Sequence, residues 1–144
     1  LKKILPKYFN SYPIKKHEVT KAILANSINL KKIIKVIHLE IRKKMNFFLK
    51  KNKNRKVVIL DVPLLLENRI NKKNDILVFV QSKRLDVLKR LKRRANFNQK
   101  LLNKFRKLQL PLDYKKRKSH FIIKNDFTNK FIKRDVKHIL KKVL

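Results

Sequence analysis

The stretch VVILDVPLLLEN, residues 57–68, decides the fold class. It begins with an apolar, largely β-branched run, which is typical of a strand buried on both faces of a parallel sheet and predicts a strand over residues 56–61. Pro63 ends such a strand, and it suits the first turn of a helix because its missing N–H is not needed there. The leucines that follow predict a short apolar helix over residues 64–70.

Two further apolar runs predict strands. DILVFV at 75–80 and FII at 121–123 are short and rich in β-branched and aromatic residues. Strands that alternate with helices are typical of α/β proteins with a parallel sheet. The sequence therefore predicts an α/β fold, and three strands are so few for such a sheet that part of it is expected to be missing.

Helices are predicted where apolar residues recur at steps of three or four. Asn26 and Ser27 offer a break and a new N-cap between the first two. The expected helices cover residues 18–25, 29–50, 83–94 and 96–110, the fourth ended by Pro111, and a last helix follows a turn at Asn125-Asp126 and runs to the C-terminus.

The chain has 144 residues and a formal net charge of +33, from 42 Lys and Arg against 9 Asp and Glu. The high positive charge has two interpretations. It reflects either a drift of the composition toward Lys, Asn and Ile, with generic affinity for polyanions, or a dedicated surface for binding nucleic acid. The Phe residues stand mostly inside apolar runs, which favours the first interpretation. A small basic RNA- or ribosome-binding protein is the alternative function.

Several absences narrow the function classes. There is no Cys, so a disulfide framework and a Cys-based zinc site are excluded. No apolar run approaches the roughly 20 residues of a membrane span, and no secretory signal opens the chain, so we expect a cytoplasmic protein. There is also no Gly, which phosphate-cradling loops require, so an enzyme built on such a loop must carry it elsewhere. Leu1 in place of Met is consistent with a fragment or an unusual start.

Basic residues cluster on the helix predicted directly after the second strand. Arg90, Arg93 and Arg94 lie on or beside one face of the stretch RLDVLKRLKRR, away from its leucines. Phosphoryl transfer needs neutralisation of the transferring group, and Arg supplies bidentate donors. The alternative is a solvated basic face, which is the ordinary state of such a run in so basic a protein.

Two other side chains allow both a structural and a functional interpretation. His38 lies in the long helix, where a lone His is either a packed or surface residue or a base. Glu67 is either a solvated acid or the partner of one of the many cations. The four histidines show no metal-ligand spacing, so no metal site is predicted.

Taken in order, these stretches resemble the dephospho-CoA kinase family. The family's D-x-P-L-L-x-E segment is similar to ILDVPLLLE at 59–67, and its H-P-x-[IV]-R segment to His38–Arg42, with Leu39 in place of Pro. Two other similar segments are the lid run L-K-R-x-x-x-R at 88–94 and the closing A-D-x-V-I-x-N at 119–125. The family's R-x-x-x-Q-x-x-x-x-x-K run is approximated by Arg106, Gln109 and Lys115, with its first spacing shortened by one.

This resemblance implies ATP-dependent phosphorylation of the ribose 3′-hydroxyl of dephospho-CoA, the last step of coenzyme A synthesis, with Mg²⁺ accompanying ATP. Arg90 is the expected stabiliser of charge on the transferring group. The residues expected to bind ATP are Arg90, Arg93, Arg94 and Asn125, and those expected to bind dephospho-CoA are His38, Arg42, Asp61, Pro63, Leu64 and Glu67.

The resemblance also implies what is missing. The family's Gly-rich P-loop and the Asp-Ala-Asp segment with its catalytic base have no counterpart here, and the family's sheet places the missing first strand between two that remain. The expected fold is a three-layer parallel sheet of the P-loop kinase type, incomplete and inactive alone. Residues 1–144 would form one such domain, with a helical CoA-binding region at 14–55, core strands at 56–82, lid helices at 83–118, and the last strand and C-terminal helix at 119–144.

Overall fold

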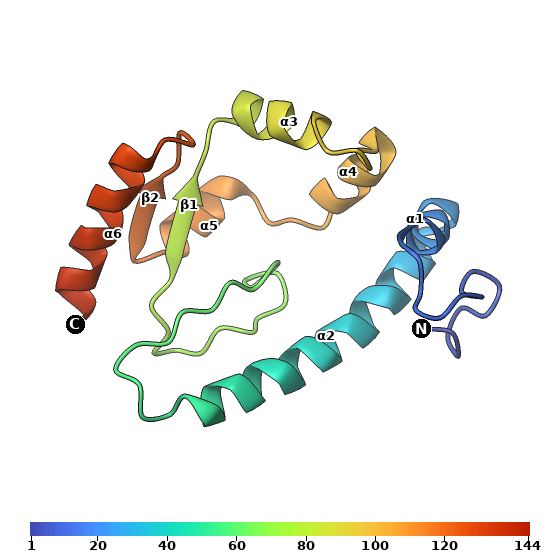
Figure 1. Cartoon of the computed structure of the whole chain (residues 1–144), viewed down its shortest axis with the longest axis horizontal. Coiled ribbons are helices and arrows are strands. Elements are labelled where there is room, and N and C mark those ends of the chain that lie inside the picture. Colours follow the sequence, from blue (N-terminus) through green and yellow to red (C-terminus); the bar gives the residue numbers. More distant parts are fainter. The chain divides into compact units, whose positions relative to one another are not determined.

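The structure is a computed structural model that describes the chain from residue 1 to 144, except the side chains of residues 129 and 130. It divides into two compact units, one of Leu1–Val58 with Gln99–Phe105 and one of Ile59–Asn98 with Arg106–Leu144. The elements, labelled in Figure 1, are α1 (Lys16–Ala25), α2 (Ser27–Lys51), β1 (Val78–Gln81), α3 (Arg84–Lys92), α4 (Gln99–Arg106), α5 (Leu112–Lys118), β2 (Phe121–Lys124) and α6 (Asn129–Val143).

The first unit contains the two predicted N-terminal helices, α1 and α2, packed against each other. The Asn26 side chain caps α2 by accepting the Ile28 backbone N–H at 2.8 Å, as the break in the sequence predicts. Asn29 is buried and donates to the Ala22 carbonyl at 3.0 Å, which ties the two helices together. Among the side chains that the structure describes, the buried apolar ones all belong to this unit: Leu5, Phe9, Ala22, Ile23, Leu30 and Ile33.

A buried carboxylate fixes the segment that leads into α1. Glu18 is 8% exposed and accepts the backbone N–H groups of Asn10, Ser11 and Lys15 at 2.9, 3.1 and 2.9 Å. The Ser11 hydroxyl also donates to this carboxylate. The Ser11 hydroxyl and the Lys15 and Asn10 N–H groups lower the pKa of Glu18 to about 2, because each stabilises the charged form.

The second unit is built on a small parallel sheet, so the expected α/β class is confirmed. β1 pairs with β2 in a register that places Val78 opposite Phe121 and Gln81 opposite Lys124. Figure 1 shows the two strands side by side, with α6 next to β2. Asp135 of α6 accepts the Lys124 backbone N–H at 3.1 Å, which joins the helix to the end of β2.

His120, the residue directly before β2, extends the hydrogen-bond ladder between the two strands. His120 donates its backbone N–H to the Leu77 carbonyl at 2.8 Å, and its Nδ1 accepts the Leu77 N–H at 2.9 Å. The imidazole therefore supplies the acceptor that a backbone carbonyl supplies elsewhere in the ladder.

Two predictions of strands and one of a helix are wrong for the described chain. Residues 56–61 form no strand, and Ile59 is 80% exposed; a strand needs a hydrogen-bonded neighbour, and β1 pairs only with β2. The strand predicted at 75–80 is not buried on both faces, since Val80 is 54% exposed.

The third concerns the helix predicted at 64–70, where residues 64–69 form turns instead. Leu64 and Arg69 have φ values of 56° and 49°, in the left-handed region, which a right-handed helix does not allow. The predicted helix at 96–110 is shorter than expected, since α4 ends at Arg106, and α5 begins directly after Pro111.

Candidate functional site

The carboxyl ends of β1 and β2 meet at one edge of the sheet, because the strands are parallel. The chain leaves this edge from β1 into α3 and from β2 into a loop at residues 125–128 (Figure 1). The Asn125 backbone N–H donates to the Gln81 carbonyl at 2.8 Å, so this loop is fixed to the end of β1. Ligands of open α/β sheets gather at such an edge.

The loop at 125–128 is held by its own side chains. Asn125 Oδ1 accepts the Phe127 N–H at 2.8 Å, and Asp126 Oδ1 accepts the Thr128 N–H at 2.9 Å and its hydroxyl at 2.7 Å. The Thr128 hydroxyl and N–H lower the pKa of Asp126, and the charge of Lys83 lowers it further. Lys83 is the N-cap residue of α3, the helix that follows β1.

Arg90 of α3 contacts the same loop. Its guanidinium carbon lies 4.4 Å from the centroid of the Phe127 ring, in a cation–π contact. The structure therefore brings Arg90 and Asn125, both predicted to bind ATP, to one loop. Arg93 and Arg94 are exposed at the end of α3.

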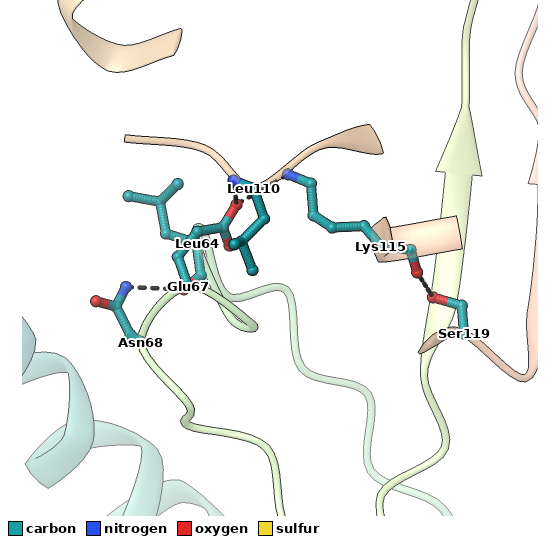
Figure 2. Close-up of polar contacts among 6 residues, drawn as sticks. All are labelled: Leu64, Glu67, Asn68, Leu110, Lys115 and Ser119. Atoms are coloured by element: carbon teal, nitrogen blue, oxygen red, sulfur yellow. Dashed lines mark hydrogen bonds and ion pairs between the residues drawn. The ribbon is translucent and has the colours of Figure 1, made fainter. Parts of the chain in front are cut away.

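A second polar cluster surrounds Glu67 (Figure 2). Glu67 Oε1 accepts the Leu110 N–H at 3.0 Å and pairs with Lys115 Nζ at 3.0 Å. The Glu67 side chain is 8% exposed. Burial acts to raise the pKa of Glu67, but the Lys115 ammonium and the Leu110 N–H outweigh it, so the pKa lies below its ordinary value.

Neighbouring hydrogen bonds brace this cluster on both sides. Asn68 Nδ2 donates to the Leu64 carbonyl at 2.7 Å, which closes the turn that carries Glu67. The Ser119 hydroxyl donates to the Lys115 carbonyl at 2.9 Å, at the end of α5. Of the two open interpretations of Glu67, the structure shows the ion pair.

A cavity of about 400 Å³ borders the Glu67 cluster. Leu77 lines it directly before β1, and Lys118 lines it shortly before β2. It therefore lies at the amino edge of the sheet, opposite Arg90 and Phe127. Its other lining residues are Leu66, Glu67, Arg69, Asn71, Leu110 and Tyr114.

The sequence model of one protein family, described as dephospho-CoA kinase, matches residues 10–130. The chain belongs to the dephospho-CoA kinase family. It is 32% identical over 124 residues to the dephospho-CoA kinase of Wolbachia pipientis wMel, covering 85% of this chain and 63% of that protein. It is 33% identical over 126 residues to that of Fusobacterium nucleatum, covering 86% and 62%.

A third relative, the dephospho-CoA kinase of Bacillus anthracis, is 31% identical over 112 residues, which cover 75% of this chain and 55% of that protein. The chain thus spans less than two thirds of the length of these family members.

The remaining residues predicted from the family resemblance lie in different places. Asp61 and Pro63 are exposed, and Leu64 is half-buried at its left-handed turn. His38 is half-buried and Arg42 is exposed, four residues apart on one face of α2 in the first unit.

Phe127 and Asp126 also belong to this cluster at the carboxyl edge, and neither was predicted from the sequence. The predicted turn at Asn125-Asp126 was the available signal, because it places the residues that follow it directly after a strand end.

The donor set does not suit a resident divalent metal. Among the described side chains, no three His, Asp or Glu groups gather as a metal-binding cluster. Mg²⁺ prefers several oxygen ligands, so the residues described here do not hold it on their own. In the part of the chain that the structure describes, no helix has the length and apolar character to cross a membrane.

Proposed function

We propose that this chain supplies the lid and the substrate-facing part of a dephospho-CoA kinase, which transfers the γ-phosphoryl group of ATP to the ribose 3′-hydroxyl of dephospho-CoA. The observation that carries the proposal is the carboxyl-edge cluster, where Arg90 lies over the loop that begins at Asn125. The family match over residues 10–130 supports the reaction class.

Arg90 is the residue that would stabilise charge during transfer. Phosphoryl transfer spreads negative charge over the equatorial oxygens of the moving group, and a guanidinium offers them planar, bidentate donors. Arg93 and Arg94 follow at the exposed end of α3 and would add to ATP binding, with Asn125 in the loop that Arg90 contacts. Lys83, whose charge lowers the pKa of Asp126 in this loop, would add to the positive potential there.

The family resemblance assigns dephospho-CoA binding to His38 and Arg42 in the first unit and to Asp61, Pro63 and Leu64 in the second. Exposed Arg42 is suited to a phosphate, and Asp61 and Pro63 follow the apolar run at which the family resemblance places a strand end. Glu67 would act differently, because its carboxylate is committed to Lys115 and Leu110. Its contribution would be to hold the turn after Pro63 in place.

The 144 residues do not by themselves supply a complete reaction centre. They contain no Gly, so no loop of this chain gives a phosphate the close backbone approach of a P-loop. We therefore propose that residues 1–144 alone do not turn over dephospho-CoA. We expect Mg²⁺ to enter with ATP and its phosphates, and we assign no step of this chain to it.

The sheet is proposed to be incomplete in the same way. Val78 and Val80 on β1 are 40% and 54% exposed, and Ile59 is 80% exposed. A further parallel strand between β1 and residues 56–61 would pair with the edge of β1 away from β2, and helices on both faces would cover these apolar side chains and give the three-layer P-loop kinase architecture. Residues 14–55 would then form the substrate-binding region, 56–82 core strands, 83–118 the lid, and 119–144 the closing strand and helix.

Ligand protection tests this function on the chain as it stands. Thermal unfolding is measured without ligand, with ATP, with dephospho-CoA, and with an equally charged inorganic polyphosphate as the control for generic anion binding. The proposal expects ATP and dephospho-CoA to raise the unfolding temperature more than the control does. Equal shifts with all three anions, or selective binding of RNA alone, would contradict it.

A further inference from the structure

The backbone at Phe127 is unusual for a bulky residue. Its φ is 66°, in the left-handed region that favours glycine, because a Cβ there crowds the following carbonyl oxygen. Such a conformation persists only where the surroundings hold it. Here Asn125 Oδ1 accepts the Phe127 N–H at 2.8 Å, and Asp126 Oδ1 accepts the Thr128 N–H at 2.9 Å.

The turn places the aromatic ring against Arg90. The guanidinium carbon is 4.4 Å from the ring centroid, well inside the roughly 6 Å of an effective cation–π contact. Phe127 is 37% exposed and Arg90 is exposed, so the guanidinium is not buried by this contact. The ring therefore restrains a long side chain that would otherwise sample many rotamers in water.

The contact leaves the chemistry of the guanidinium available. The five N–H donors lie on the three nitrogens around the carbon that the ring contacts, and a phenyl ring does not neutralise the charge. Because Arg90 is exposed, an anion can bind these donors while Phe127 holds the group.

We propose that Phe127 is a positioning residue for Arg90, which holds the guanidinium at the carboxyl edge of the sheet, ready for the phosphates of ATP. The inference rests on the proposed function, in which Arg90 binds ATP. Phe127 makes no contact with ATP in this account, and it acts through Arg90 alone. The strained turn is the means by which the ring reaches the helix.

The contact itself is tested without nucleotide. In the full chain, the Nε–Hε resonance of Arg90 is recorded by NMR in the wild type, F127L and F127Y. A guanidinium above an aromatic ring experiences a ring-current shift. We expect this shift in the wild type and F127Y and its loss in F127L. An Arg90 resonance that is the same in all three proteins would overturn the proposal.

The role of the contact is tested by ATP affinity in a double-mutant cycle. F127L removes the aromatic face but keeps an apolar side chain, and we expect it to weaken ATP binding about threefold to tenfold, the scale of one cation–π contact. F127Y is expected to retain the affinity. In the R90A background F127L is expected to have no further effect, because Phe127 acts only through Arg90.

The outcomes separate this inference from the proposed function. An equal loss from F127L with and without Arg90 would show a direct or purely structural role and overturn the inference, and tighter binding by F127L would do so as well. If F127L leaves the affinity for ATP unchanged, the role of Phe127 is overturned, but the proposed nucleotide site is not. A wild-type chain that does not bind ATP would overturn the proposed nucleotide site together with this role.

Discussion

The Glu67 carboxylate lies 3.0 Å from the Lys115 ammonium, and the two side chains are only 8% and 19% exposed. The pair joins the turn after Pro63 to α5, and the Leu110 N–H shares the same carboxylate oxygen. Removing one member of a shielded ion pair leaves the other charge without a partner, and this costs more than the pair itself contributes.

Breaking this pair on one side is expected to destabilise the chain. Glu67→Gln keeps an oxygen for the Leu110 N–H but removes the charge that faces Lys115, and we expect a loss of about 2 kcal/mol in the free energy of unfolding. Urea denaturation measures it. Lys115→Met is expected to cost a similar amount, and the double variant less than the sum of the two. Strict additivity would show that the side chains do not interact.

The hydrogen bonds to Glu18 predict that the stability of the folded chain depends on pH. Its pKa in the folded chain is about 2, against an ordinary value of 4.5, so the unfolded chain takes up a proton first as the pH falls. The contribution of Glu18 to stability is therefore complete above about pH 4.5 and declines from there toward pH 2. Amide exchange of the Asn10 and Ser11 N–H groups across this range measures it.

The matched control for that experiment is Glu18→Gln, which does not titrate. Protection of these amides in the variant should be lower at neutral pH and should stay level between pH 4.5 and 2. A wild-type protein whose protection is also level over this range would contradict the role assigned to the Glu18 carboxylate.

The imidazole of His120 is expected to protect the Leu77 amide. Its Nδ1 accepts that N–H at 2.9 Å, so His120→Leu should speed exchange of the Leu77 amide by about tenfold, the effect of losing one net hydrogen bond. His120→Asn can offer Oδ1 near the same position and should retain much of the protection. If the Leu and Asn variants exchange at the same rate, the side chain of His120 is not the acceptor.

The regular helices were predictable from the sequence because a helix is local. The apolar spacing that predicted the helix at 29–50 reflects contacts within one element, and the structure has α2 from Ser27 to Lys51. Residues 56–61 have an equally clear pattern for a strand, but a strand also needs a hydrogen-bonded neighbour, which can lie far away in the sequence. Within the described chain, residues 56–61 pair with no other strand.

The candidate site was predictable in its residues but not in its contacts. Arg90 and Asn125 stood out from the sequence, yet Phe127 did not, because nothing in a sequence of apolar and basic residues shows that a ring will lie under one particular guanidinium. The left-handed φ of Phe127 was hidden for a related reason: in a chain without Gly, the residue type gives no signal for such a turn.

Arg90 is expected to matter most during phosphoryl transfer. In a chain that also carries a P-loop, Arg90→Ala should lower turnover by about 100-fold, the scale of losing one preorganised charge stabiliser. Lys92→Ala removes a cation from the same helix at a position that the family motif leaves open, and it should change turnover by less than about threefold if only general charge is lost. Equal losses in the two variants would remove Arg90 from its role.

The most direct test of the kinase assignment is formation of CoA from dephospho-CoA and ATP, followed by mass spectrometry. The chain is assayed alone and fused behind the N-terminal P-loop segment of the Wolbachia pipientis wMel relative, with that segment alone as the control. The account predicts CoA from the fused protein and none from either part. CoA produced by residues 1–144 alone would contradict the need for an added phosphate loop, and a folded fusion that binds neither substrate and produces no CoA would contradict the assignment itself.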